Sequence, residues 1–135
     1  MRHIIEQSDE YAALAAEVIE AHGDLHWIRD QVSIGYLTSD QEKKKTGGEV
    51  LGECILVKEL YRIFCPYDFL IVIYEANTAG MSQEQLKILL YHELLHVGMK
   101  ESEEEPEYVV NPHDVEDFRI VLESYGLDWA RKGGE

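Results

Sequence analysis

Leu86-Lys-Ile-Leu-Leu-Tyr-His-Glu-Leu-Leu-His-Val97 is the stretch that decides the fold, because it places the H-E-x-x-H motif inside a pattern typical of a buried helix. Residues four apart on a helix lie about one turn apart on the same face, so two imidazoles can bind one metal ion. The motif in this context indicates zinc. We therefore expect His92 and His96 to be metal ligands and Glu93 to lie beside the ion as a general base.

The flanking sequence predicts where the motif helix begins and ends. Ser82 and Gln85 have the spacing of a capping box, which predicts a helix start at this point. Gly98 is a possible C-terminal stop, so we expect the helix to run to about Val97. The acidic segment 101–106 is expected to be an exposed loop.

Other segments carry simpler patterns. Helical spacing of apolar residues predicts a first helix over about 9–21 and a last helix from near 111 or 112 to 124. A run of β-branched and aromatic residues predicts a buried strand over 69–74. Residues 32–38 alternate like a strand, residues 50–57 are also strand-like, and residues 58–64 could be helical.

A third metal ligand is needed, because catalytic zinc usually takes three protein ligands and leaves its fourth position for water. His113 is the one further histidine that follows the motif helix in a segment able to fold back across it. We favour His113 for this reason. Carboxylates are also acceptable to zinc, so the alternatives are Asp114, Glu116 and Asp117, and those that do not bind could orient the imidazoles.

Such a site would perform metal-assisted hydrolysis, in which zinc lowers the pKa of its bound water to about 7. Glu93 would take a proton from this water and later return it to the leaving amine. The preferred function is a zinc metallopeptidase that acts on a peptide laid along the strand ending near Asn77. The alternative is a non-catalytic, zinc-stabilised acidic protein that binds a host protein, although an inert site usually fills all four positions and has no need of Glu93.

The net charge and the apolar content of the chain limit the classes of partner that we expect. The formal charge of −15, from 27 acidic and 12 basic residues, argues against duplex nucleic acid. The cluster Lys43-Lys44-Lys45 is expected to be a solvated loop tip. No signal-peptide core and no run of about eighteen apolar residues is present, so we expect a cytoplasmic protein that does not interact with membranes. Cys54 and Cys65 do not form a C-x-x-C pair and are expected to be reduced, partly buried thiols.

The chain resembles the putative phage metallopeptidase family in three segments, which are 68–74, 89–96 and 113–118. Gly126 and Trp129 extend the match. The resemblance covers about 32–129 and implies a phage- or prophage-encoded α+β protein of zincin-like fold in a single domain, 1–135. It implies a small, mostly antiparallel sheet of about three strands packed against an N-terminal helix, the HExxH helix and a C-terminal helix. In that fold the edge strand precedes the motif helix and borders the cleft.

The same resemblance implies zinc held by His92, His96 and His113, with Glu93 as the base. The pattern is also similar to the SprT-like proteases, where an aromatic residue closely follows the later histidine, a place that Phe118 fills with one more intervening residue. The chain lacks the H-E-x-x-H-x-x-G-x-x-H extension of metzincins.

Overall fold

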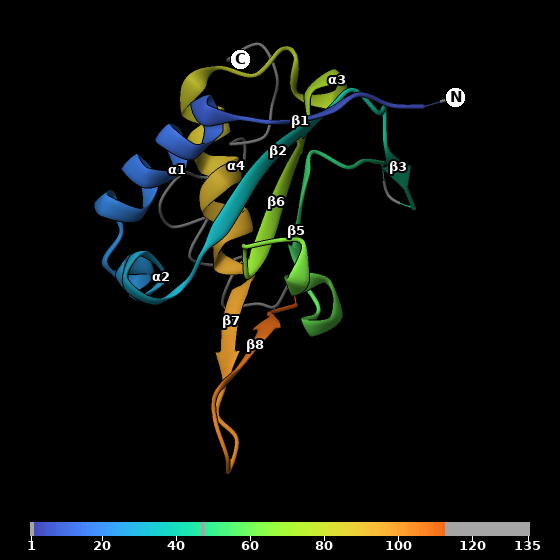
Figure 1. The fold of residues 1–135 in the computed structure, drawn as a ribbon. Helices are drawn as coiled ribbons and strands as arrows, with labels where there is room; N and C mark the ends of the chain where they lie inside the picture. The colour runs from blue at the N-terminus through green and yellow to red at the C-terminus, as the bar shows by residue number, and fades with distance from the viewer. Residues whose placement is uncertain (1, 47, 113–135) are drawn as a thin grey trace.

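In the computed structural model, which describes residues 2–46 and 48–112, a four-stranded mixed sheet forms one layer of an α+β fold (Figure 1). Its strands are β1 (Ile5–Gln7), β2 (Ile34–Ser39), β5 (Gly52–Leu56) and β6 (Phe69–Tyr74), in the order β1-β2-β6-β5. The pairs β1–β2 and β5–β6 are antiparallel, whereas β2 and β6 are parallel. The predicted α+β class is confirmed.

The sheet differs from the expected one in two ways. The three-residue strand β1 adds a fourth strand. All of its residues are exposed, so it has no buried face that an alternating apolar pattern could mark. The strand before the motif helix, β6, is central and buried, while β5 is the edge strand. The expectation that a peptide would lie along the strand ending near Asn77 is therefore wrong, because both neighbours of β6 are already occupied by β2 and β5.

Helices cover one face of this sheet. Helix α1 (Asp9–Ala21) begins at Ser8, whose side chain accepts a hydrogen bond from the Tyr11 amide at 3.1 Å. Its buried residues Leu14, Ala15 and Val18 face the core. A short 3₁₀ turn η1 (Gly23–Leu25) leads into α2 (His26–Gln31), and α3 (Glu75–Thr78) follows β6. The first predicted helix is thus confirmed over its full length.

The motif helix is α4 (Gln83–Leu95), and it packs beside α1 against the sheet (Figure 1). Its predicted capping box is confirmed: the Gln85 amide donates to the Ser82 hydroxyl at 3.2 Å, and the Ser82 amide donates to the Gln85 side chain at 2.8 Å. Leu89, Leu90 and Leu94 are fully buried in the core. This burial fixes the direction in which the remaining side chains of the helix point.

The helix ends two residues earlier than predicted, and Gly98 does not stop it. His96 is the C-cap, and the chain continues directly into a hairpin of β7 (Val97–Lys100) and β8 (Glu107–Val110). Within residues 2–46 and 48–112 only Gly48 has a positive φ, so Gly98 lacks the left-handed conformation of a helix stop. Pairing of Val97 with Val110 replaces further helix, and the predicted loop 101–106 is the exposed tip of this hairpin.

Three small elements complete the described fold. A two-stranded ribbon of β3 (Lys44–Lys45) and β4 (Gly48–Glu49) precedes β5, and a 3₁₀ turn η2 (Glu59–Ile63) follows it where a helix was considered possible. No helix in the described part of the chain is long and apolar enough to cross a membrane. The predicted C-terminal helix lies outside the described residues from position 113 onward, while Asn111 and Pro112 are not helical.

Candidate metal centre

The imidazoles of His92 and His96 lie together at the C-terminal end of α4. Their ring centroids are 5.1 Å apart and their planes are inclined at 84°. A ring nitrogen binds zinc at about 2.1 Å, which places each ring centre about 3.2 Å from the ion, and a tetrahedral angle then separates the two centres by roughly 5 Å. The observed spacing therefore fits two imidazoles that share one zinc ion.

The orientation of the His96 ring is fixed by a hydrogen bond at its Nδ1 atom. Its Nδ1 is hydrogen-bonded to the backbone carbonyl of Asn111. A carbonyl oxygen only accepts, so Nδ1 carries the hydrogen and Nε2 is the basic nitrogen of the neutral ring. Metal-binding histidines commonly donate their second N–H to a carbonyl in this way. The contact thus selects the tautomer that a metal ligand needs.

Asn111 makes two further contacts with the end of the motif helix. Its amide donates to the His96 carbonyl at 2.7 Å, and its side-chain Nδ2 donates to the Leu95 carbonyl at 3.3 Å. These bonds satisfy carbonyls that a helix end leaves without partners. The sequence does not reveal this role of Asn111, because the contact depends on the hairpin that brings residue 111 back to His96.

Gly98 makes room for this arrangement. A Cβ atom at position 98 would lie 2.4 Å from Oδ1 and 2.7 Å from Nδ2 of Asn111. The Asn111 side chain would have to rotate away and lose its bond to Leu95. Gly98 therefore serves close packing in the hairpin.

We expect Gly98→Ala to lower the free energy of unfolding by about 1–2 kcal/mol, the cost of a lost hydrogen bond and local overpacking. Urea denaturation of the metal-free protein measures this change. Gly23→Ala is the matched control, because a Cβ there meets no heavy atom within 4 Å. Equal effects of the two substitutions would contradict the packing role assigned to Gly98.

Glu93 is buried, with 5% of its surface exposed, and lies against the edge strand. A Cβ at Gly52 of β5 would come within 3.5 Å of the Glu93 Cγ and 3.2 Å of the Val72 carbonyl. The lack of a side chain at position 52 therefore lets α4 approach β5 closely at the motif. The role of Gly52 has no local signal in the sequence, because it depends on a neighbour 41 residues away in the chain.

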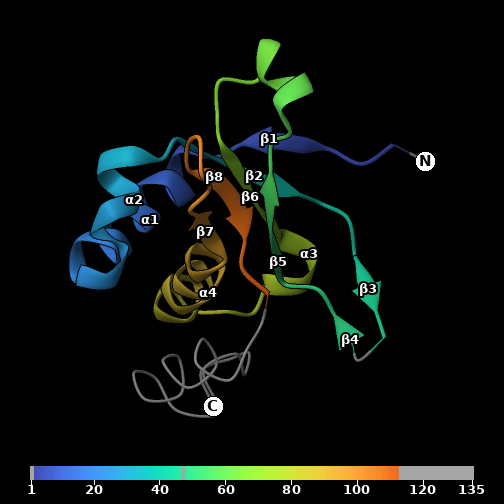
Figure 2. The same ribbon diagram turned by 90° about the horizontal axis from the view of Figure 1, so that it is seen from below.

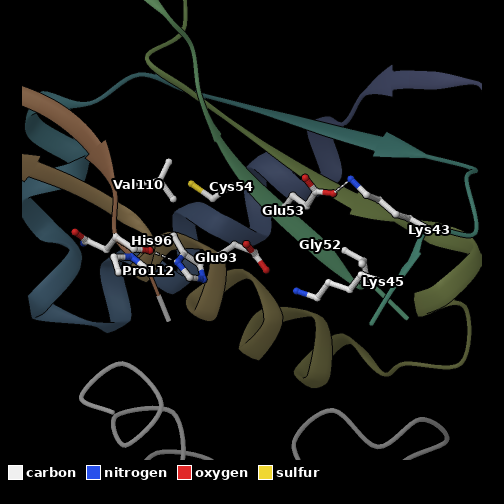
Figure 3. Close-up of a pocket in the computed structure, with 11 residues that line it drawn as sticks. Lys43, Lys45, Gly52, Glu53, Cys54, Glu93, His96, Val110 and Pro112 are labelled. Carbon is white, nitrogen blue, oxygen red and sulfur yellow. Dashed lines mark hydrogen bonds and ion pairs between the residues drawn. The ribbon is translucent and has the colours of Figure 1, made fainter. Parts of the chain in front are cut away.

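A cavity of about 420 Å³ lies between the start of β5, the motif helix and the end of β8, as Figure 3 shows. Figure 2 shows the same arrangement from below, with the ribbon β3–β4 at one side of β5 and β8 at the other. Glu93 and His96 open into this cavity. Its other lining residues are Lys43, Lys45, Val50, Gly52, Glu53, Cys54, Val110, Asn111 and Pro112.

Cys54 lines the cavity as an uncharged thiol. Burial raises its pKa to about 12, and the neighbouring Glu93 carboxylate adds to the rise. Both Cys54 and Cys65 are free and partly buried, as predicted. Within the described ranges no three His, Cys, Asp or Glu side chains gather as a metal-binding group.

The structure thus brings together three of the four predicted site residues, His92, Glu93 and His96. The favoured third ligand, His113, and the alternatives Asp114, Glu116 and Asp117 all lie outside the described residues. Pro112, the last described residue before them, lines the cavity beside His96.

Comparison with known proteins now identifies the class. The family model of the putative phage metallopeptidases matches residues 3–133, nearly the whole chain, and the chain belongs to this family. No curated protein and no solved structure matches it. The predicted family is therefore confirmed, and the family implies a peptidase that uses a metal ion.

Proposed function

We propose that this chain is a zinc-dependent peptidase with His92 and His96 as metal ligands and Glu93 as the general base. One observation carries the proposal: the buried Glu93 carboxylate and the His96 imidazole line the same cavity beside the edge strand β5. The tautomer of His96 is fixed by its hydrogen bond to Asn111, and the ring centroid of His92 lies 5.1 Å from that of His96. Burying ionisable groups has a free-energy cost, so their convergence at a cavity indicates a functional site.

His113 is proposed as the third ligand. It follows Pro112 directly, and consecutive Cα atoms are only about 3.8 Å apart across a trans peptide bond. Because Pro112 lines the cavity, the chain enters the segment that contains the candidate ligands at the rim of the site. Zinc is the favoured ion because imidazole nitrogens suit it and the H-E-x-x-H spacing is typical of zinc peptidases.

The residues of the chain then have distinct roles. Zinc, when bound, polarises the substrate carbonyl and acidifies a water molecule. Glu93 accepts the proton of that water as it attacks the peptide carbonyl and passes the proton to the leaving amine. The Asn111 carbonyl accepts from Nδ1 of His96 and so leaves Nε2 as the nitrogen that would hold the metal.

The substrate is proposed to be an extended peptide that pairs with β5. Among the described strands β5 pairs with β6 alone, and its residues Gly52, Glu53 and Cys54 line the cavity. An edge strand offers backbone donors and acceptors to an added strand. A peptide bound there would pass over Glu93, which touches the strand at Gly52.

Removal and restoration of the metal test this function. We expect purified protein to carry about one zinc per chain, because one set of three ligands forms one site. We also expect it to cleave members of a peptide library. Chelation should abolish cleavage, and added zinc should restore it. Bound zinc without any cleavage would instead support the non-catalytic interaction protein, and protein that binds no zinc would contradict both functions.

A further inference from the structure

The cavity carries two lysines although the chain as a whole has a charge of −15. Among the residues that the structure describes, four charged side chains line it: Lys43, Lys45, Glu53 and Glu93. A strongly acidic protein repels anionic ligands at long range, so cations placed at its cavity act against that field locally.

Lys43 is fully engaged within the protein. Its ammonium group forms an ion pair with Glu53 and lies 5.5 Å from the centre of the Tyr74 ring. The Tyr74 hydroxyl donates to the same Glu53 oxygen at 2.9 Å, and burial together with this bond raises the pKa of Tyr74. Lys43 and Glu53 therefore cancel each other's charge.

The backbone of Lys43 is also fixed, which positions the ribbon that follows it. Its carbonyl accepts hydrogen bonds from the buried Asn77 side chain at 2.9 Å and from the Val50 amide at 3.0 Å. Asn77 also donates to the Val50 carbonyl at 2.8 Å, so both ends of the ribbon β3–β4 are tied to one buried side chain. The ribbon is thus held at the cavity from its base.

Lys45 differs from Lys43 in its contacts with the described residues. Within residues 2–46 and 48–112 no ion pair includes it, and its side chain is exposed. Figure 3 shows it extending past Gly52 toward Glu93. The adjacent Lys44 does not line the cavity; it lies opposite Glu49 in the ribbon, and alternate residues of a strand point to opposite faces.

We propose that Lys45 binds a carboxylate of the substrate close to the scissile bond, so that this peptidase prefers peptides carrying a negative charge there. The inference rests on the proposed function, in which a peptide lies along β5 between Lys45 and Glu93. The carboxylate is either an Asp or Glu side chain or the free C-terminus of the peptide. A lysine that has three donors and forms no ion pair with the described residues supplies the charge that such a group needs.

The test compares matched peptides whose cleavage site has been mapped by mass spectrometry. Each contains Glu or its uncharged isostere Gln at one position near the scissile bond, and each is made with a free and with an amidated C-terminus. For wild type we expect kcat/KM to be about 1.5-fold to fivefold higher for the charged member, the range of an exposed ion pair. The position of the effect shows whether the source is a side chain or the C-terminus.

Variants assign this preference to one side chain. Lys45→Glu should remove the preference and favour peptides with Lys at that position, whereas Lys44→Glu, which changes net charge equally, should keep it. High salt should weaken the wild-type preference. Cleavage by wild type without any charge preference, or an equal preference in wild type and Lys45→Glu, would overturn the inference while leaving the peptidase function intact.

A binding measurement tests the role of Lys45 separately from the proposed peptidase function. Zinc-loaded Glu93→Gln protein is titrated with the same fluorescein-labelled peptides, with and without Lys45→Glu, and anisotropy reports affinity. Absence of cleavage by wild type would contradict the peptidase function. In that case a carboxylate preference in binding that Lys45→Glu removes would still support Lys45 as an anion contact, and its absence would reject it.

Discussion

Glu93→Gln is expected to lower kcat/KM for peptide cleavage about 10²- to 10⁴-fold while the protein keeps its zinc, since this is the range that a positioned general base contributes. Glutamine has nearly the same shape but cannot accept the proton of the attacking water. It fits the same buried position against Gly52, so the fold should be unchanged. Steady-state kinetics and metal analysis of the same preparation measure both quantities.

Glu84→Gln is the matched control, because Glu84 lies exposed in the first turn of the same helix, far from the motif in sequence. It should leave cleavage and zinc content at wild-type values. Undiminished cleavage by Glu93→Gln would reject the proposed mechanism. Loss of zinc together with activity would show that Glu93 holds the site together and does not act as a base.

The second large effect is expected for His113→Ala, which should weaken zinc binding by more than about 100-fold, the upper range for loss of an outer-shell partner alone. Two imidazoles on one helix leave the ion with half of its tetrahedral shell, and protein ligands usually fill three of the four positions at catalytic sites. Competition with a zinc-sensitive chelator measures the dissociation constant. Cleavage should fall in parallel at limiting zinc.

Single alanine variants of Asp114, Glu116 and Asp117 complete this experiment. Each should retain zinc if His113 is the ligand, apart from the smaller loss expected where a carboxylate orients an imidazole. A carboxylate variant that loses zinc while His113→Ala retains it would identify the carboxylate as the third ligand. Retention of zinc by all four variants would contradict a ligand in this segment.

Elements with strong local signals were predictable from sequence. The strand Phe69–Tyr74 was predicted with its exact limits, because six consecutive apolar residues leave it no exposed position in the sheet. Helix α1 and the start of α4 were predicted equally well, since hydrogen bonds within four residues define a helix and its cap. The H-E-x-x-H part of the site followed from the same local geometry.

Features that depend on distant pairing were not predictable. Strand β1 has no pattern of its own and exists because Gln7 pairs with Leu37, 30 residues away. Assigning the edge position to β5 required the parallel pairing of β2 with β6. The roles of Asn111 and Gly52 likewise arise from contacts between segments, and the place of Lys45 at the cavity depends on how the ribbon β3–β4 is held. Gly98 was misassigned because pairing of β7 with β8 replaces a helix stop.

The hairpin that follows the motif helix allows the number of residues between the motif and the segment after β8 to differ among relatives. Strands β7 and β8 pair from Val97–Val110 to Lys100–Glu107. His96 and Asn111, which flank the pair Val97–Val110, therefore stay adjacent whatever the length of the connection between Lys100 and Glu107. Doubling a flexible connection costs only about 0.6 kcal/mol of closure entropy. Insertions at this tip would lengthen the interval between His96 and Asn111 along the chain without breaking their contact. Relatives therefore need not share the spacing that this chain has between the motif and the proposed third ligand His113.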